Sequence, residues 1–179
     1  MFVNRPIATG ISIACGLLFA ACESNPQADE SATARIDPLV TTPGAVAPAA
    51  GSGAAGAPAT AGSISGSATF TIPGSGNIRM LVSITGCTTG KQYPIHIHEG
   101  GSCENAMTQG GHWDIPRGEA IPNVSCVNGV GTLTYTRTNA DAKTAWSIHN
   151  PANNLVGHTV VLHDPDDGTV RVACGVITR

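Results

Sequence analysis

The stretch ISGSATFTIPGSGNIRMLVSIT, residues 64–85, indicates the fold class of this chain. Apolar and polar residues alternate along 78–85, and the apolar residues of 64–72 also share one face. A period of two is typical of a strand with one buried face. Between the two segments, residues 73–77 read Pro-Gly-Ser-Gly-Asn, which is a turn signal. We therefore predict an antiparallel hairpin at 64–85.

The same short-strand pattern continues to the end of the chain. Further strand candidates are 93–98, 121–127, 130–137, 158–163 and 170–177. The dipeptide Asn128-Gly129 between two of these candidates is a strong hairpin signal. No long segment shows the 3.6-residue period of a helix. Many short strands separated by turns predict an all-β sandwich or barrel.

The N-terminal residues 1–22 have the pattern of an export signal. Arg5 provides a positive start, and the apolar run 11–21 is too short to span a bilayer comfortably. The run ends Leu-Leu-Phe-Ala-Ala-Cys, which resembles a bacterial lipoprotein box with Cys22 as the lipidated residue. The alternative is ordinary signal cleavage, with Cys22 incidental. We expect an exported protein of the periplasm or cell envelope, anchored to the membrane through a lipid on Cys22.

Residues 23–63 are predicted to be a tether and a low-complexity segment. Residues 32–40 could form a first strand, whereas 41–63 contain nine Ala, five Gly and three Pro. Such a composition buries too little apolar surface to offset the entropy lost on ordering, so we expect a flexible linker or a long loop. If it is a loop, 32–40 belong to the folded domain. If it is a linker, the domain is 64–179.

The charge of the chain argues against a nucleic-acid-binding protein, and its cysteines suit an exported protein with disulfides. The chain has 9 basic and 12 acidic residues; without residues 1–22, which contain one Arg, the net charge is 8 − 12 = −4. Nothing in this balance indicates a nucleic-acid partner. Of six cysteines, Cys15 leaves with the signal and Cys22 would carry lipid. The other four are enough for two disulfides, in three possible connectivities, and disulfides persist outside the cytoplasm.

The residues with metal-binding chemistry begin at His96-Ile97-His98. On a strand the two imidazoles point the same way and Ile97 points to the core. Imidazole suits both copper and zinc, although two histidines alone could also be surface residues. Two further histidines strengthen the metal interpretation: His112 follows two glycines, which suits a tight loop, and His163 ends a very apolar strand.

Four motifs resemble those of the copper-zinc superoxide dismutase family and occur in the same order as in that family. They are HIHEGGSC (96–103), GH (111–112), GHTVVLH (157–163) and RVACGVI (171–177). The resemblance covers about residues 64 to 179. It implies an all-β fold, an eight-stranded Greek-key β-barrel.

The resemblance also implies copper bound by four histidines, which are His96, His98, His112 and His163. Four neutral imidazoles can hold both Cu(I) and Cu(II), the two states that a redox cycle needs. His112 would also shuttle a proton if it releases copper on reduction, as the resemblance implies.

A disulfide from Cys103 to Cys174 and an arginine beside the copper, Arg171, are implied in the same way. That disulfide would pin together strands and loops that are distant in sequence. Cys87 and Cys126 are left over and lie beside predicted turns, so a second bridge is expected. Their alternative is two free thiols.

The chain departs from the family at its zinc site. That site needs the shared histidine, two more histidines and an aspartate in the following loop, but residues 113–147 contain no histidine. We therefore expect copper without zinc, as in the copper-only members of the family. A carboxylate would then orient His112 in place of zinc. Glu119 is the first candidate and Asp114 the second, and the alternative for both is a surface acid.

These observations predict an exported copper-dependent superoxide dismutase that converts superoxide to oxygen and hydrogen peroxide. The alternative is a periplasmic copper-binding or buffering protein of the same fold with little or no turnover. Arg171 separates the two hypotheses, because a buffer does not need an anion-attracting residue beside its metal. Nothing in the sequence predicts the oligomeric state.

Overall fold

The structure, a computed structural model, describes residues 30–39, 64–72, 77–114, 121–138 and 145–179. The predicted export signal at 1–22, the predicted lipidation at Cys22, the low-complexity residues 41–63 and Glu119 lie outside these residues. In the part of the chain that is described, no helix has the length and apolar character needed to cross a membrane.

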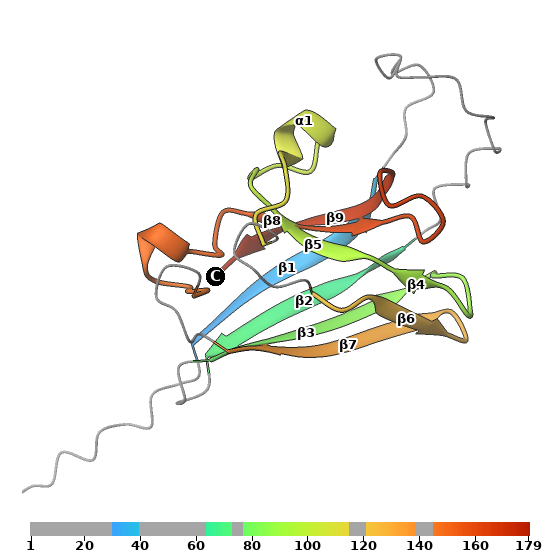
Figure 1. The fold of residues 1–179 in the computed structure, drawn as a ribbon, viewed down its shortest axis with the longest axis horizontal. Coiled ribbons are helices and arrows are strands. Elements are labelled where there is room, and N and C mark those ends of the chain that lie inside the picture. The colour runs from blue at the N-terminus through green and yellow to red at the C-terminus, as the bar shows by residue number, and fades with distance from the viewer. Residues whose placement is uncertain (1–29, 40–63, 73–76, 115–120, 139–144) are drawn as a thin grey trace, which may run out of the picture.

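The described residues form nine strands in one antiparallel sheet, ordered β4-β6-β7-β3-β2-β1-β9-β8-β5 (Figure 1). The strands are β1 (Glu30–Pro38), β2 (Ser65–Ile72), β3 (Ile78–Thr85), β4 (Gln92–Tyr93), β5 (Ile95–His98), β6 (Val124–Val127), β7 (Val130–Arg137), β8 (Thr159–His163) and β9 (Arg171–Thr178). Two short helices, α1 (Ala106–Gln109) and η2 (Pro151–Asn153), lie in loops. The sheet curls into a nearly closed barrel, so the predicted all-β barrel is confirmed.

The barrel comes close to closure at Pro94. β4 pairs with β6 at one end of the strand order and β5 pairs with β8 at the other, and only Pro94 separates β4 from β5. We predicted one strand at 93–98, and the family resemblance implied eight strands in all. The structure has two strands here because proline has no N–H to donate to a ladder. The Pro94 carbonyl instead accepts from the backbone N–H of His163, with N···O 2.8 Å.

β1 lies between β2 and β9 and is hydrogen-bonded to both. The sequence left open whether residues 32–40 form a strand, and the structure has a strand at Glu30–Pro38. Ala32, Ala34 and Ile36 alternate into the barrel and are buried. β1 therefore supplies part of the core.

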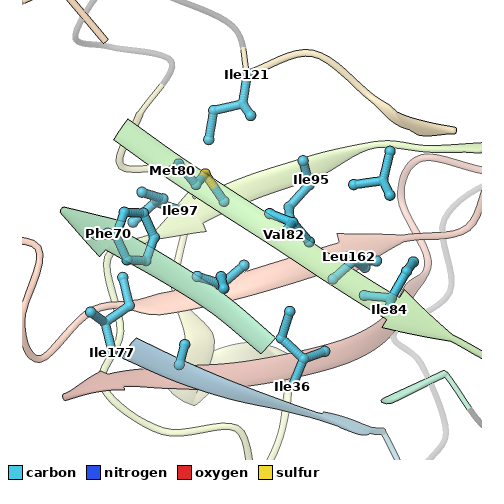
Figure 2. Packing of buried hydrophobic residues seen from close by; sticks show 14 of the residues in the cluster. Ile36, Phe70, Met80, Val82, Ile84, Ile95, Ile97, Ile121, Leu162 and Ile177 are labelled. Atoms are coloured by element: carbon cyan, nitrogen blue, oxygen red, sulfur yellow. The ribbon is translucent and has the colours of Figure 1, made fainter. Parts of the chain in front are cut away.

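The core lies inside the barrel and follows the period of two (Figure 2). Ile78, Met80, Val82 and Ile84 of β3 are completely buried, and β3 pairs with β2 from Arg79 to Thr85. The predicted antiparallel pairing is therefore confirmed, whereas residues 73–76 of the predicted turn lie outside the described residues. Ile95 and Ile97 of β5 point into the same core, as Figure 2 shows. The side chains between and beyond them, His96 and His98, consequently lie on the outer face of the barrel.

Two disulfides connect loops to strands. Cys87–Cys126 joins the turn after β3 to β6, and Cys103–Cys174 joins the loop before α1 to β9. Both pairings are those expected from the sequence and the family resemblance. Figure 1 shows α1 and its loop on the side of the barrel formed by β5, β8 and β9. The second disulfide thus holds this loop against β9, the strand that pairs with β8.

Candidate metal centre

Three separate segments deliver histidines to the outer face of the barrel. His96 and His98 come from β5, and His163 ends the neighbouring strand β8. His112 comes from the segment that follows α1, which turns back along β5 and forms a β-bridge with His98. The predicted ligands are therefore brought together by strand pairing and by this returning segment.

Glycines allow the returning segment to approach β5 closely. The Gly100 N–H donates to the carbonyl of Gln109 at 2.8 Å, and a Cβ on Gly100 would lie 1.8 Å from the Thr108 oxygen. Gly110 has φ +71°, in the left-handed region that favours glycine. Its backbone conformation ends α1 and directs the chain toward His112. The tight loop expected before His112 is built in this way.

The side chains of His98, His112 and His163 converge. One ring nitrogen from each lies within 4.8 Å of the others. His98 Nδ1 lies 3.0 Å from the Gly110 carbonyl, which is only an acceptor, so His98 carries its proton on Nδ1 and a lone pair on Nε2. That Nε2 lies 3.1 Å from Nε2 of His163. Two nitrogens bound to one ion at about 2.0–2.1 Å each can be this far apart, so the set fits a metal ion.

Burial keeps these imidazoles neutral. It lowers the pKa of His98 and of His163 to about 4, and the positive charge of nearby Arg171 acts in the same direction. Burial also lowers the pKa of His112, and the charge of a protonated His96 would lower it further. Neutral imidazole is the form that binds metals. The cluster therefore offers lone pairs at pH values where an ordinary histidine would be largely protonated.

His96 occupies a different position from the other three histidines. Its ring stacks on that of His112, with centroids 4.1 Å apart and an angle of 25° between the planes. Its Nδ1, however, lies 3.1 Å from Oδ2 of Asp114. The structure thus brings three of the four predicted ligands into one group and places the fourth beside them, bonded to a carboxylate.

Asp114 is positioned against His96 rather than against His112, the histidine that we expected a carboxylate to orient. The Trp113 N–H donates to the carbonyl of Ile97 at 2.7 Å, which brings the next residue alongside His96. Asp114 is completely buried, and its Oδ1 has no hydrogen-bond partner among the described residues. A carboxylate that accepts from one ring nitrogen fixes the orientation of the ring. The first candidate, Glu119, lies outside the described residues and remains a prediction.

We expect Asp114→Asn to weaken copper binding about ten-fold, because a neutral amide holds the ring of His96 less firmly than a carboxylate does. The measurement is a competition titration with a copper chelator. Asp166→Asn is the matched control, since Asp166 is exposed and pairs with Lys91. Equal copper affinity in the two variants would mean that Asp114 does not position His96.

Arg171 reaches the centre from β9, where it is the cross-strand partner of His163. Its Nη2 donates to the carbonyl of Gly110 at 2.8 Å, and the same carbonyl accepts from His98 Nδ1. One carbonyl oxygen therefore joins the guanidinium to a histidine of the cluster. Arg171 is only partly buried and remains charged at neutral pH.

Gln109 is a site residue that nothing in the sequence pattern indicates. Its Oε1 accepts from Nη1 of Arg171 at 3.0 Å, and its side chain is completely buried. The residue ends the four-residue helix α1, which is too short to show a period, and its partner is 62 positions away. No local signal could have identified it.

Comparison with known proteins gives a family and a fold. A sequence model of the family described as copper/zinc superoxide dismutase (SODC) matches residues 64–177. No curated protein matches the chain. The solved structure of the clock protein EA4 is 22% identical, with a TM-score of 0.55, over 84% of this chain and 94% of that one. Candida albicans superoxide dismutase 5, in a structure described with Cu(II), is 16% identical, with a TM-score of 0.54, over 84% and 92%. At these identities the solved structures show a shared fold alone.

Proposed function

The chain belongs to the copper/zinc superoxide dismutase family, and we propose that it is an exported, copper-dependent superoxide dismutase without a zinc site. It would convert superoxide to oxygen and hydrogen peroxide. The observation that carries this proposal is the convergence of three neutral imidazoles beside a guanidinium.

The histidines would hold the metal. His98, His112 and His163 would form the core of the site, with His96 as the fourth ligand. Copper bound there would supply one-electron redox chemistry by alternating between Cu(II) and Cu(I). The hydrogen bond from His98 Nδ1 to Gly110 would keep one of these imidazoles in its ligand tautomer.

Arg171 and His112 would act on the substrate and on protons. The guanidinium of Arg171 would attract superoxide to a protein whose net charge is otherwise negative. Each hydrogen peroxide molecule needs two protons. His112 would carry one of them on a ring nitrogen, because its ring is less buried than those of His98 and His163 and can exchange protons with solvent.

The donor set supports copper without zinc, and the cysteines support export. Residues 113–147 contain no histidine, so the loop that follows His112 has none of the additional imidazoles that the family's zinc site uses. The two disulfides suit an oxidising compartment, such as the periplasm or the cell envelope. A lipid on Cys22 would anchor the protein to the membrane there.

The test combines metal analysis with superoxide decay measured by pulse radiolysis. Protein offered both metals should hold about one copper and little zinc. We expect Arg171→Ala to lower the superoxide rate about ten-fold at low salt, and by less at high salt, while copper content stays the same. Arg79→Ala removes the same charge at an exposed position of β3, which pairs with β2 and β7 and not with the strands of the centre, and serves as the control.

Three outcomes would contradict the proposal. Stoichiometric zinc beside copper would replace the copper-only site with a two-metal site. Equal rates for Arg171→Ala and Arg79→Ala would remove the steering role. Wild-type protein that is fully loaded with copper but does not consume superoxide would favour the copper-buffering alternative.

A further inference from the structure

The guanidinium of Arg171 is held entirely by neutral acceptors. Nη1 donates to the carbonyl of Ala106 at 2.7 Å and to Gln109 Oε1 at 3.0 Å, and Nη2 donates to Gly110. Among the described residues, no carboxylate forms an ion pair with Arg171. An arginine beside an aspartate or glutamate would be fixed equally well, but its positive charge would be largely cancelled for an approaching anion.

These bonds leave part of the guanidinium available. A guanidinium has five N–H groups, and three of them donate to the acceptors above. The Nε–H and the second N–H of Nη2 have no acceptor within the described parts of the chain. The backbone carbonyls and the Gln109 amide therefore fix one portion of the group while two donors and the full charge remain for a ligand.

Gln109 is the one side chain among these acceptors, and its orientation follows from chemistry. Arginine only donates hydrogen bonds, so the amide must present Oε1 to Nη1 and turn Nε2 away. That Nε2 is buried and has no hydrogen-bond partner among the described residues. Leaving a buried donor unpaired is costly, so simple packing stability does not explain an amide at this position.

The backbone around Gln109 is firmly held. Asn105 caps α1, its side-chain oxygen accepting from the N–H groups of Met107 and Thr108, and the Thr108 hydroxyl accepts from the Asn105 N–H. The Gln109 carbonyl accepts from Gly100 next to β5. The amide is thus carried on a short, capped helix joined to the strand that holds His98.

We propose that Gln109 is a positioning residue for Arg171, one that orients the guanidinium through a neutral amide and so preserves its charge for a small monovalent anion at the metal centre. This inference rests on the proposed function for its substrate, superoxide. It adds that the affinity of the centre for anions depends on an uncharged side chain at position 109 as well as on Arg171. A carboxylate at position 109 would still accept the hydrogen bond from Arg171, but its negative charge would weaken the binding of the anion.

The test compares Gln109→Glu with Gln92→Glu in the copper-loaded protein. Gln92 is exposed on β4, so the second variant makes the same chemical change and the same change in net charge away from the site. The probe is azide, titrated by the visible absorption of copper(II). We expect Gln109→Glu to raise the azide Kd about ten-fold relative to Gln92→Glu at low salt, and to flatten the salt dependence of the superoxide rate.

A second variant separates charge from position. Gln109→Leu keeps a side chain of similar size but removes the acceptor from Arg171. It should weaken azide binding a few-fold while the salt dependence persists, because the guanidinium keeps its charge. Thermal unfolding and copper content of each variant show that the protein is folded and loaded.

The outcomes distinguish this inference from the function on which it rests. If Gln109→Glu matches Gln92→Glu in azide affinity and salt dependence while superoxide is consumed, the role of Gln109 is refuted and the dismutase stands. If the wild type consumes no superoxide but the azide affinities differ as expected, the positioning role stands and the dismutase is refuted.

Discussion

His98→Ala is expected to lower copper affinity and the superoxide rate about 100-fold or more. Replacing a partner outside the metal ligands costs about 10- to 100-fold, and a ligand should cost at least as much. His98 is completely buried, and its Nε2 lies 3.1 Å from Nε2 of His163. Without it, only His112 and His163 of the three-histidine group remain.

The measurements are copper content after dialysis against a chelator and superoxide decay in the same samples. His149→Ala is the control, because His149 is an exposed histidine outside the cluster. The Gly110 carbonyl keeps a donor in His98→Ala, since Arg171 still bonds to it, so we expect the variant to fold. A His98→Ala protein that retains one tightly bound copper would contradict the assigned centre.

Removing the Cys103–Cys174 disulfide is expected to affect both stability and the site. The bond joins residues 71 positions apart, and the chain-entropy model gives about 4 kcal/mol of unfolding free energy for a loop of this length. Cys103 also begins the loop that carries α1, Gly110 and His112. Serine at both positions should therefore lower the stability of the metal-free protein by about 4 kcal/mol and weaken copper binding about ten-fold.

The chain contains its own control for this experiment. Cys87–Cys126 closes a loop of 39 positions, for which the same model also gives about 4 kcal/mol. It joins the turn after β3 to β6 and touches none of the clustered histidines. Serine at Cys87 and Cys126 should lower stability in denaturant unfolding by a similar amount while copper affinity is retained. An equal loss of copper affinity in both double variants would indicate that the first disulfide acts through stability alone.

The all-β fold class and the family could be predicted from the amino-acid sequence, which also named the candidate histidine ligands. The period of two along 78–85 is a local property, because alternate side chains of any strand face opposite sides. The same rule placed His96 and His98 outside the barrel and Ile97 inside it, as the structure has them. Motif order then identified the family, which the match over residues 64–177 shows.

The closure of the barrel and the contacts of its buried polar groups could not be predicted from the sequence. Closure at Pro94 depends on two strand pairings, β4 with β6 and β5 with β8. Both β6 and β8 are distant from Pro94 in the sequence. Asp114 lies beside His96 because the segment after α1 returns along β5. Gln109 accepts a hydrogen bond from Arg171, which is 62 positions later in the sequence. Such contacts depend on hydrogen bonds between segments that are distant in sequence, and on glycines that let two backbone segments approach closely. No period or short motif encodes them, because each depends on where a remote segment lies.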